Sequence, residues 1–171
     1  MPKLIKRDAD GQFAAAEDAF IDIREEDGVP AAIPGNGPVI LSLARFQEEG
    51  DALLSGGRQV GVRIASNEAI EDLAYDLPRL ALVALEFPKY RDGRAYTSAR
   101  LLRERFGYTG EIRAVGDVLR EQAGFMVRCG IDAFEVSDGS SPEEWAAATH
   151  RYRHVYQRAA DSRAPAWKER A

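Results

Sequence analysis

The chain is poor in cysteine and in long apolar runs. Its 171 residues include one cysteine, Cys129, which excludes a disulfide within the chain and any all-cysteine metal or iron–sulfur site built from one chain. No apolar stretch approaches the roughly 20 residues that a membrane-spanning helix needs. The first residues, Met1 to Lys6, lack the apolar core of a signal peptide. We therefore expect a cytoplasmic protein without a membrane partner.

Common catalytic signatures are also absent. The sequence has no phosphate-binding glycine loop of the P-loop type, no dinucleotide-binding GxGxxG after a strand and no serine in a nucleophile-elbow setting. His150 and His154 are four residues apart, but no third ligand stands at a recognisable spacing from them. We therefore expect no cofactor and no metal site, and the sequence leaves open whether the protein is an enzyme.

Charge is distributed unevenly along the chain. The net charge is −5, yet the segment from Lys89 to Arg128 holds nine basic and five acidic residues, so the remaining segments together carry −9. A basic segment in an acidic protein suits a small anion or an acidic protein partner. Nucleic-acid binders usually carry a basic excess over a whole face, and we therefore expect no nucleic-acid partner.

The pattern of apolar residues changes after residue 38. Before it, the sequence has short β-type runs and a proline- and glycine-rich loop; after it, strand and helix patterns alternate. The expected strands cover 39–41, 59–65, 80–87, 111–115 and 131–136, and the expected helices 43–49, 68–77, 95–106, 118–128 and 142–158. We divide the chain into an N-terminal arm (1–38), an α/β domain (39–158) and a flexible tail (159–171).

Strands that alternate with helices of about ten residues are typical of right-handed βαβ units and a parallel sheet. The predicted fold class is α/β: a mostly parallel five-stranded sheet of sequential βα units, similar to part of a (β/α) barrel. An irregular N-terminal β arm and a C-terminal helix complete it. A doubly wound, flavodoxin-like sheet is the alternative, and the sequence does not decide between the two.

The most informative segment, 88–98, lies between the third expected strand and the helix that follows it. Ligands of parallel α/β proteins collect where strands end and helices begin, and exposed N–H groups there favour anions. Lys89, Arg91, Arg94 and Ser98 are the candidate anion-binding residues, since arginine offers forked donors to an oxyanion. The alternative is structural, with Arg91 or Arg94 paired to Glu86 or Asp117.

Four expected strands each place one charge inside an apolar run, and central parallel strands are normally apolar throughout. These residues are Arg63, Glu86, Arg113 and Glu135. Their alternating signs allow ion pairs between neighbouring strands, because isolated buried charges are costly. In the other interpretation they line a pocket beneath the basic segment, and Arg63 and Arg113 bind the anion there.

The string FPKYRDGRAYTSARLLRERFGYTGEIRAVGDVLREQ, residues 87–122, resembles a bacterial family of unknown function labelled as an oxidoreductase involved in sulfite reduction. The resemblance continues through residues 129–136 and, more weakly, over most of the chain from Val39. It implies a cytoplasmic protein of assimilatory sulfate reduction, associated with the sulfite reductase haemoprotein.

The sequence and the resemblance are together compatible with three functions. The first is an accessory protein of sulfate and sulfite reduction, which binds the sulfite reductase haemoprotein and a small oxyanion at the basic segment. The second is a small enzyme acting on an anionic metabolite, with Glu86 or Asp117 as general acid or base and Tyr96 as a donor. The third is a structural or assembly protein whose basic segment is an interface, with Trp145, Tyr152 and Tyr156 on the last helix as a homodimer surface.

Overall fold

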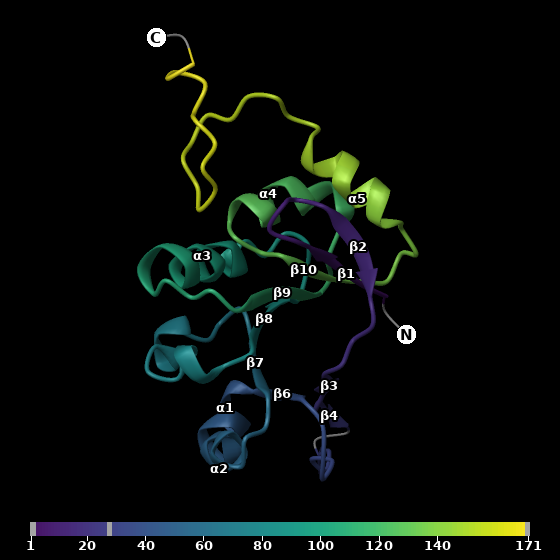
Figure 1. The fold of residues 1–171 in the computed structure, drawn as a ribbon, viewed down its shortest axis with the longest axis vertical. Helices are drawn as coiled ribbons and strands as arrows, with labels where there is room; N and C mark the ends of the chain where they lie inside the picture. Colours follow the sequence, from purple (N-terminus) through teal and green to yellow (C-terminus); the bar gives the residue numbers. More distant parts are fainter. Residues whose placement is uncertain (1–2, 27–28, 170–171) are drawn as a thin grey trace.

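The computed structural model describes residues 3–26 and 29–169, which form an α/β fold (Figure 1). The strands are β1 (Lys3–Arg7), β2 (Phe13–Ala16), β3 (Ile21–Asp22), β4 (Glu25–Glu26), β5 (Val29–Pro30), β6 (Val39–Ser42), β7 (Val60–Ile64), β8 (Leu82–Phe87), β9 (Glu111–Gly116) and β10 (Ala133–Val136). The α-helices are α1 (Leu43–Arg45), α2 (Asp51–Ser55), α3 (Arg94–Arg100), α4 (Ala123–Arg128) and α5 (Pro142–Thr149). Shorter helical segments are η1 (Phe46–Gly50), η2 (Ile70–Leu73), η3 (Leu77–Arg79), η4 (Leu101–Arg105) and η5 (Arg120–Gln122).

One sheet of eight strands organises the molecule, in the order β2-β1-β10-β9-β8-β7-β6-β3. Strands β6 to β10 are parallel and adjacent in sequence order, as expected for sequential βα units. The arm extends this sheet at both edges, because β3 pairs in parallel with β6 and the β1–β2 hairpin pairs antiparallel with β10. The sheet is therefore mixed and larger than the five parallel strands predicted.

The helices α1 to α4 lie on one side of the sheet (Figure 1). Alternate residues of the parallel strands face them, for example Val62 of β7 and Leu85 of β8, and form the main apolar core. A doubly wound sheet would have helices on both faces. The singly wound alternative is the one found.

The sheet must curl strongly, because its two edges are joined by a short connection. Only residues 17–20 separate β2 at one edge from β3 at the other. Five Cα–Cα steps reach at most about 18 Å, whereas eight strands laid flat would separate these edges by about 33 Å. The result is a half-barrel whose concave side faces away from α1–α4.

The segment 17–24, which we call the strap, crosses this concave side. Phe20 packs against a second, small apolar cluster of concave-facing strand residues. The strap also carries charge: Asp18 pairs with Arg113 at 2.6 Å, Asp22 pairs with Arg63, and Arg24 lies 3.7 Å from Glu135. Three of the four strand charges thus have partners on the strap, where the sequence had suggested neighbouring strands. Arg113 also pairs with Glu111 of its own strand at 2.8 Å.

Arg63 and Arg113 lie in one row across the concave face, on either side of Ala84. The small side chain of Ala84 leaves room between the two arginines for the strap. The arm strands thus share a sheet with residues 39–136, whereas residues 1–2, 27–28 and 170–171 of the predicted arm and tail lie outside the described residues.

The last helix is shorter than expected. It begins as predicted, with Ser141 and Glu144 forming a capping box around Pro142, but ends at Thr149. There the Thr149 hydroxyl donates to the Ala146 carbonyl at 2.7 Å. Further on, Arg163 donates to the carbonyls of residues 152 and 153, which a continued helix would have used itself. The predicted helix to residue 158 is therefore wrong.

The predicted helix after Asn67 is also wrong, since two separate 3-10 turns, η2 and η3, replace it. The Glu68 carboxylate accepts a hydrogen bond from the Ala65 N–H at 2.7 Å, which ties the helix start back to the end of β7. Pro78 lies within η3. None of the helices in the described part of the chain has the length and apolarity required to span a bilayer.

Candidate functional site

Residues 88–94, which we call the basic loop, leave the end of β8 and enter α3. Neighbouring strand β9 fixes this loop. Gly116 ends β9 with φ of 94°, and a Cβ there would lie 2.5 Å from the Phe87 carbonyl oxygen, so only glycine fits this close approach. The next residue, Asp117, donates its N–H to that carbonyl at 2.7 Å and accepts the Tyr90 N–H on its carboxylate at 2.8 Å.

A second hydrogen bond fixes the carbonyl group of Tyr90. The Gln122 amide donates to the Tyr90 carbonyl at 2.7 Å. With Asp117 on its N–H and Gln122 on its carbonyl, Tyr90 has a fixed backbone, while the residue stays about half exposed (51%). The basic loop is therefore a rigid platform for its side chains.

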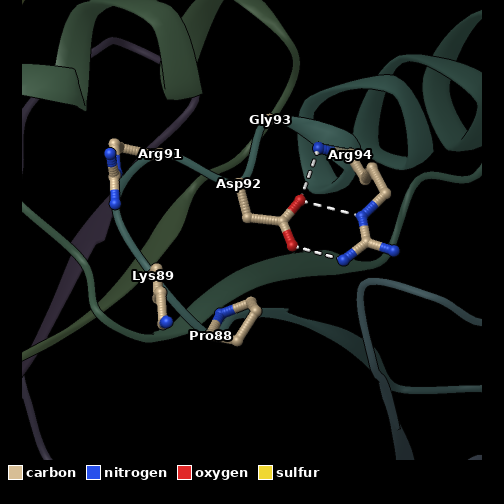
Figure 2. Close-up of a pocket in the computed structure, with 6 residues that line it drawn as sticks. All are labelled: Pro88, Lys89, Arg91, Asp92, Gly93 and Arg94. Atoms are coloured by element: carbon tan, nitrogen blue, oxygen red, sulfur yellow. Dashed lines mark hydrogen bonds and ion pairs between the residues drawn. The ribbon is translucent and has the colours of Figure 1, made fainter.

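Arg94 is neutralised by its neighbour. Asp92 accepts from the Arg94 Nε at 2.9 Å, from its Nη2 at 2.5 Å and from its backbone N–H at 3.2 Å, so the carboxylate covers the start of α3 (Figure 2). These hydrogen bonds hold the pKa of Asp92 well below its usual range. Arg94 also donates to the Ser66 hydroxyl at 2.8 Å. An oxyanion that bound Arg94 and the first N–H groups of α3 would therefore have to displace the Asp92 carboxylate.

Lys89 and Arg91 differ from Arg94. Figure 2 shows both side chains on the opposite side of the loop from the Asp92–Arg94 pair. Both are exposed, and within the described residues neither forms an ion pair; the Arg91 guanidinium lies 5.9 Å from the centre of the Tyr90 ring. The depression lined by Pro88, Lys89, Arg91, Asp92, Gly93 and Arg94 is shallow and open. The positive charges of Lys89 and Arg91 are therefore available to a binding partner.

The three candidate acid–base residues do not converge. Glu86 belongs to the concave set of strand positions, since its neighbour Phe87 faces the main core. Tyr96 packs edge-on against Phe87 with ring centres 5.3 Å apart, and burial, followed by the charge of Cys129, raises the pKa of Tyr96 to about 12. Asp117 holds the basic loop as described. The three groups are therefore apart in function and position: Glu86 faces the concave side, Tyr96 packs on the core side, and the Asp117 carboxylate is engaged by the Tyr90 N–H.

The other predicted anion-binding residues are also separate from the loop. Arg113 is buried on the concave face, where it is 1% exposed, and Arg63 is bound by Asp22. Ser98 lies on α3 one turn beyond its start, outside the depression. Of the predicted set, only Lys89, Arg91 and Arg94 line the depression of the basic loop, and Arg94 is paired there with Asp92.

Two further expectations concern the last helix. Trp145 is fully buried, with its ring centre 4.7 Å from that of Phe134 and its N–H donated to Ser140 at 2.8 Å. It is a core residue, so its assignment to a surface for homo-oligomerisation is wrong. His150 and His154 follow the helix end, and no group of three potential metal ligands occurs in the described part of the chain.

A groove of about 460 Å³, which was not predicted from the sequence, lies between α4 and the segment 150–163 that follows α5. Its walls carry Phe125, Tyr152 and Tyr156, all more than half exposed. The signal that could have found it is the aromatic and arginine content of residues 151–163. The sequence predicted that the last helix continues to residue 158, whereas the segment in fact turns back over α4.

Removal of the Asp92 carboxylate tests whether it stands in for an oxyanion. We expect the Asp92→Ala variant to bind sulfate or sulfite about tenfold more tightly than the wild type, because Arg94 and the N–H groups at the start of α3 become free. Calorimetric titration measures this, with Asp92→Ala/Arg94→Ala as the control that should lose the gain. Equal anion affinity in wild type and Asp92→Ala would contradict the assignment.

Comparison with known proteins identifies one family. Residues 61–167, more than half of the chain, match the model of a family described as bacterial protein of unknown function (DUF934). The matched range includes the basic loop and both walls of the groove, and leaves out the strap. A comparison with curated proteins gives no match. The chain therefore belongs to the DUF934 family of bacterial proteins of unknown function.

Proposed function

We propose that this protein is a cytoplasmic accessory protein of assimilatory sulfate and sulfite reduction, which docks on the sulfite reductase haemoprotein through the basic loop. One observation carries the proposal: Lys89, Tyr90 and Arg91 are exposed together on a loop whose backbone is fixed by Asp117 and Gln122. A preorganised loop loses little conformational entropy when it binds.

The residue types of the loop support docking on a protein. Tyrosine and arginine are enriched among the residues that contribute most to protein–protein binding, and an exposed positive cluster accelerates encounter with an acidic partner. Catalysis has weaker support, since Glu86 and Tyr96 lie on opposite faces of the sheet and the Asp117 carboxylate is engaged by the Tyr90 N–H. A small oxyanion held at the loop would be an additional ligand, in competition with Asp92.

The choice of partner comes from the sequence resemblance. The resembling string, residues 87–122, contains the whole basic loop together with Asp117 and Gln122, which fix it. The loop and its supports are thus the part of this chain most similar to the family associated with the sulfite reductase haemoprotein.

The test is the affinity for the purified haemoprotein. We expect the double variant Lys89→Ala/Arg91→Ala to bind about tenfold more weakly than the wild type, and the wild-type affinity to fall as ionic strength rises. Biolayer interferometry measures both effects. The matched control is Arg105→Ala/Arg153→Ala, which removes two exposed arginines outside the loop and should bind like the wild type. Undetectable binding of the wild type, or equal weakening in the control, would refute docking through this loop.

A further inference from the structure

The groove between α4 and the segment 150–163 is separate from the basic loop and has the size of a small-molecule site. Ligand pockets usually measure about 300 to 1,000 Å³, and are mostly apolar with a few convergent polar groups. This groove measures about 460 Å³. One wall is formed by α4 and the other by the residues that turn back after α5.

Aromatic surface is concentrated in this groove. Seven large apolar side chains are notably exposed in the described part of the chain, and three of them, Phe125, Tyr152 and Tyr156, line it. Phe125 belongs to the α4 wall, and both tyrosines belong to the opposite wall. Exposed aromatic side chains on two walls suit a flat ring, which can stack on aromatic residues from each side.

Positive charge accompanies the aromatic surface. Four arginines line the groove, Arg100, Arg128, Arg158 and Arg163, against one carboxylate, that of Glu121. Arg100 is paired with Glu104 and Arg128 with Asp161. The Arg158 side chain is exposed and has no hydrogen bond or ion pair to the described residues, so its guanidinium is free for an anion.

We propose that the groove binds a nucleoside phosphate, with the base between Phe125 and the two tyrosines and the phosphate on Arg158 and Arg163. Arg163 uses only its Nη2 for the carbonyls of residues 152 and 153, which leaves its Nε and Nη1 for a phosphate. A flat ring that carries a negative charge matches both features of the groove, and neither an apolar ligand nor a bare oxyanion does. The proposal does not depend on docking at the basic loop.

A ligand in this groove would bridge the two walls. Arg128 of α4 holds the segment 150–163 by two hydrogen bonds, to the Gln157 carbonyl at 2.5 Å and to Asp161 at 3.0 Å. Binding should therefore protect this segment, whose arginines are sites for trypsin. Protection of residues 150–163 provides a readout that is independent of affinity.

The experiment is a calorimetric titration of the full chain with AMP, adenosine and inorganic phosphate. We expect saturable binding of AMP, with adenosine and phosphate each weaker by about tenfold or more, because each lacks one of the two recognised groups. AMP should also slow tryptic cleavage after Arg153 and Arg158. Absence of saturable heat from AMP at millimolar concentration, or adenosine binding as tightly as AMP, would overturn the proposal.

Variants locate the binding. Phe125→Ala and Arg158→Ala should each weaken AMP binding about tenfold, and both side chains are exposed, so the fold should be retained. The matched control is Tyr75→Ala, which removes an aromatic ring that is 88% exposed and lies outside the groove. AMP binding that persists unchanged in Phe125→Ala and Arg158→Ala would place the nucleotide elsewhere and overturn the assignment of the groove.

Discussion

Replacement of Arg103 by alanine should lower the free energy of unfolding by about 3 to 5 kcal/mol at pH 7.5. Arg103 joins two turns at the end of the sheet opposite the basic loop. It donates to the carbonyls of Tyr108, Gly110 and Gly130 at 2.6, 2.8 and 3.0 Å, and to the Asp132 carboxylate at 2.8 Å. Its loss leaves three carbonyls and a largely buried carboxylate without this partner. Urea-induced unfolding measures the change.

The cost of this replacement should depend on pH. Burial raises the pKa of Asp132 from 3.8 to about 6, against the lowering effects of Arg103 and of the hydrogen bond from the Ile112 N–H. A carboxyl with a raised pKa in the folded state stabilises the fold below its unfolded pKa, and this contribution is lost as pH rises through the folded pKa. Without Arg103 the folded pKa rises further, so the variant should lose less stability at pH 5 than at pH 7.5.

The matched control for Arg103 is its neighbour two residues along. Arg105 is 61% exposed at its side chain and its ion-pair contact, to Glu71, is 3.3 Å long. Arg105→Ala should change the free energy of unfolding by less than about 1 kcal/mol. A loss below about 1 kcal/mol in Arg103→Ala, or a cost equal at both pH values, would contradict the role assigned to the Arg103–Asp132 pair.

Replacement of Arg113 by alanine should cost about 3 kcal/mol and loosen the strap. Arg113 is 1% exposed and donates to Glu111 at 2.8 Å and to Asp18 at 2.6 Å. Burial alone would lower its pKa, but hydrogen bonds and charges from Asp18 and Glu111 more than offset this, and the pKa of Arg113 is raised above its usual value. Its loss removes the link between β9 and the strap, and leaves a void beside Phe20.

Two measurements test this replacement. Urea-induced unfolding gives the loss of stability, and trypsin should cleave after Arg24 faster than in the wild type. Arg24→Gln is the comparison for stability, since this arginine forms an exposed strap–sheet pair at 3.7 Å and should cost less than about 1 kcal/mol. Wild-type stability and unchanged cleavage in Arg113→Ala would show that the strap is held by Phe20 and the backbone alone.

Much of the sheet could be predicted from the sequence. The runs that became β6 to β10 are mostly apolar on both sides, with one charge inside four of them, and this pattern indicates parallel strands without knowledge of the fold. The capping box at Ser141 likewise marked the start of α5 correctly. The end of α5 was missed because the hydrogen bonds of Thr149 and Arg163 that replace the helix involve residues up to eleven positions apart.

The candidate site could also be located from a local sequence pattern. A basic run between a strand and a helix placed Lys89, Arg91 and Arg94 in one loop. The sequence could not show that Asp92 closes on Arg94 while Lys89 and Arg91 stay free, because this depends on side-chain directions within the loop. Nor could it bring Phe125 near Tyr152 and Tyr156, since these lie on segments that meet only after the chain turns back.

Only the tertiary structure showed that the parallel strands lie in sequence order with the helices on one side of them, since the sequence left a doubly wound sheet open. The sequence by itself determined which segments form the parallel strands and where the basic loop lies. Each rests on a period or a spacing that acts over a few residues. The tertiary structure alone decided how the sheet ends: residues 17–20 are too short to join the edges of a flat sheet, so the half-barrel curls and the strap neutralises its inner arginines. These contacts join residues as far apart as Asp18 and Arg113, and no local pattern encodes such pairs.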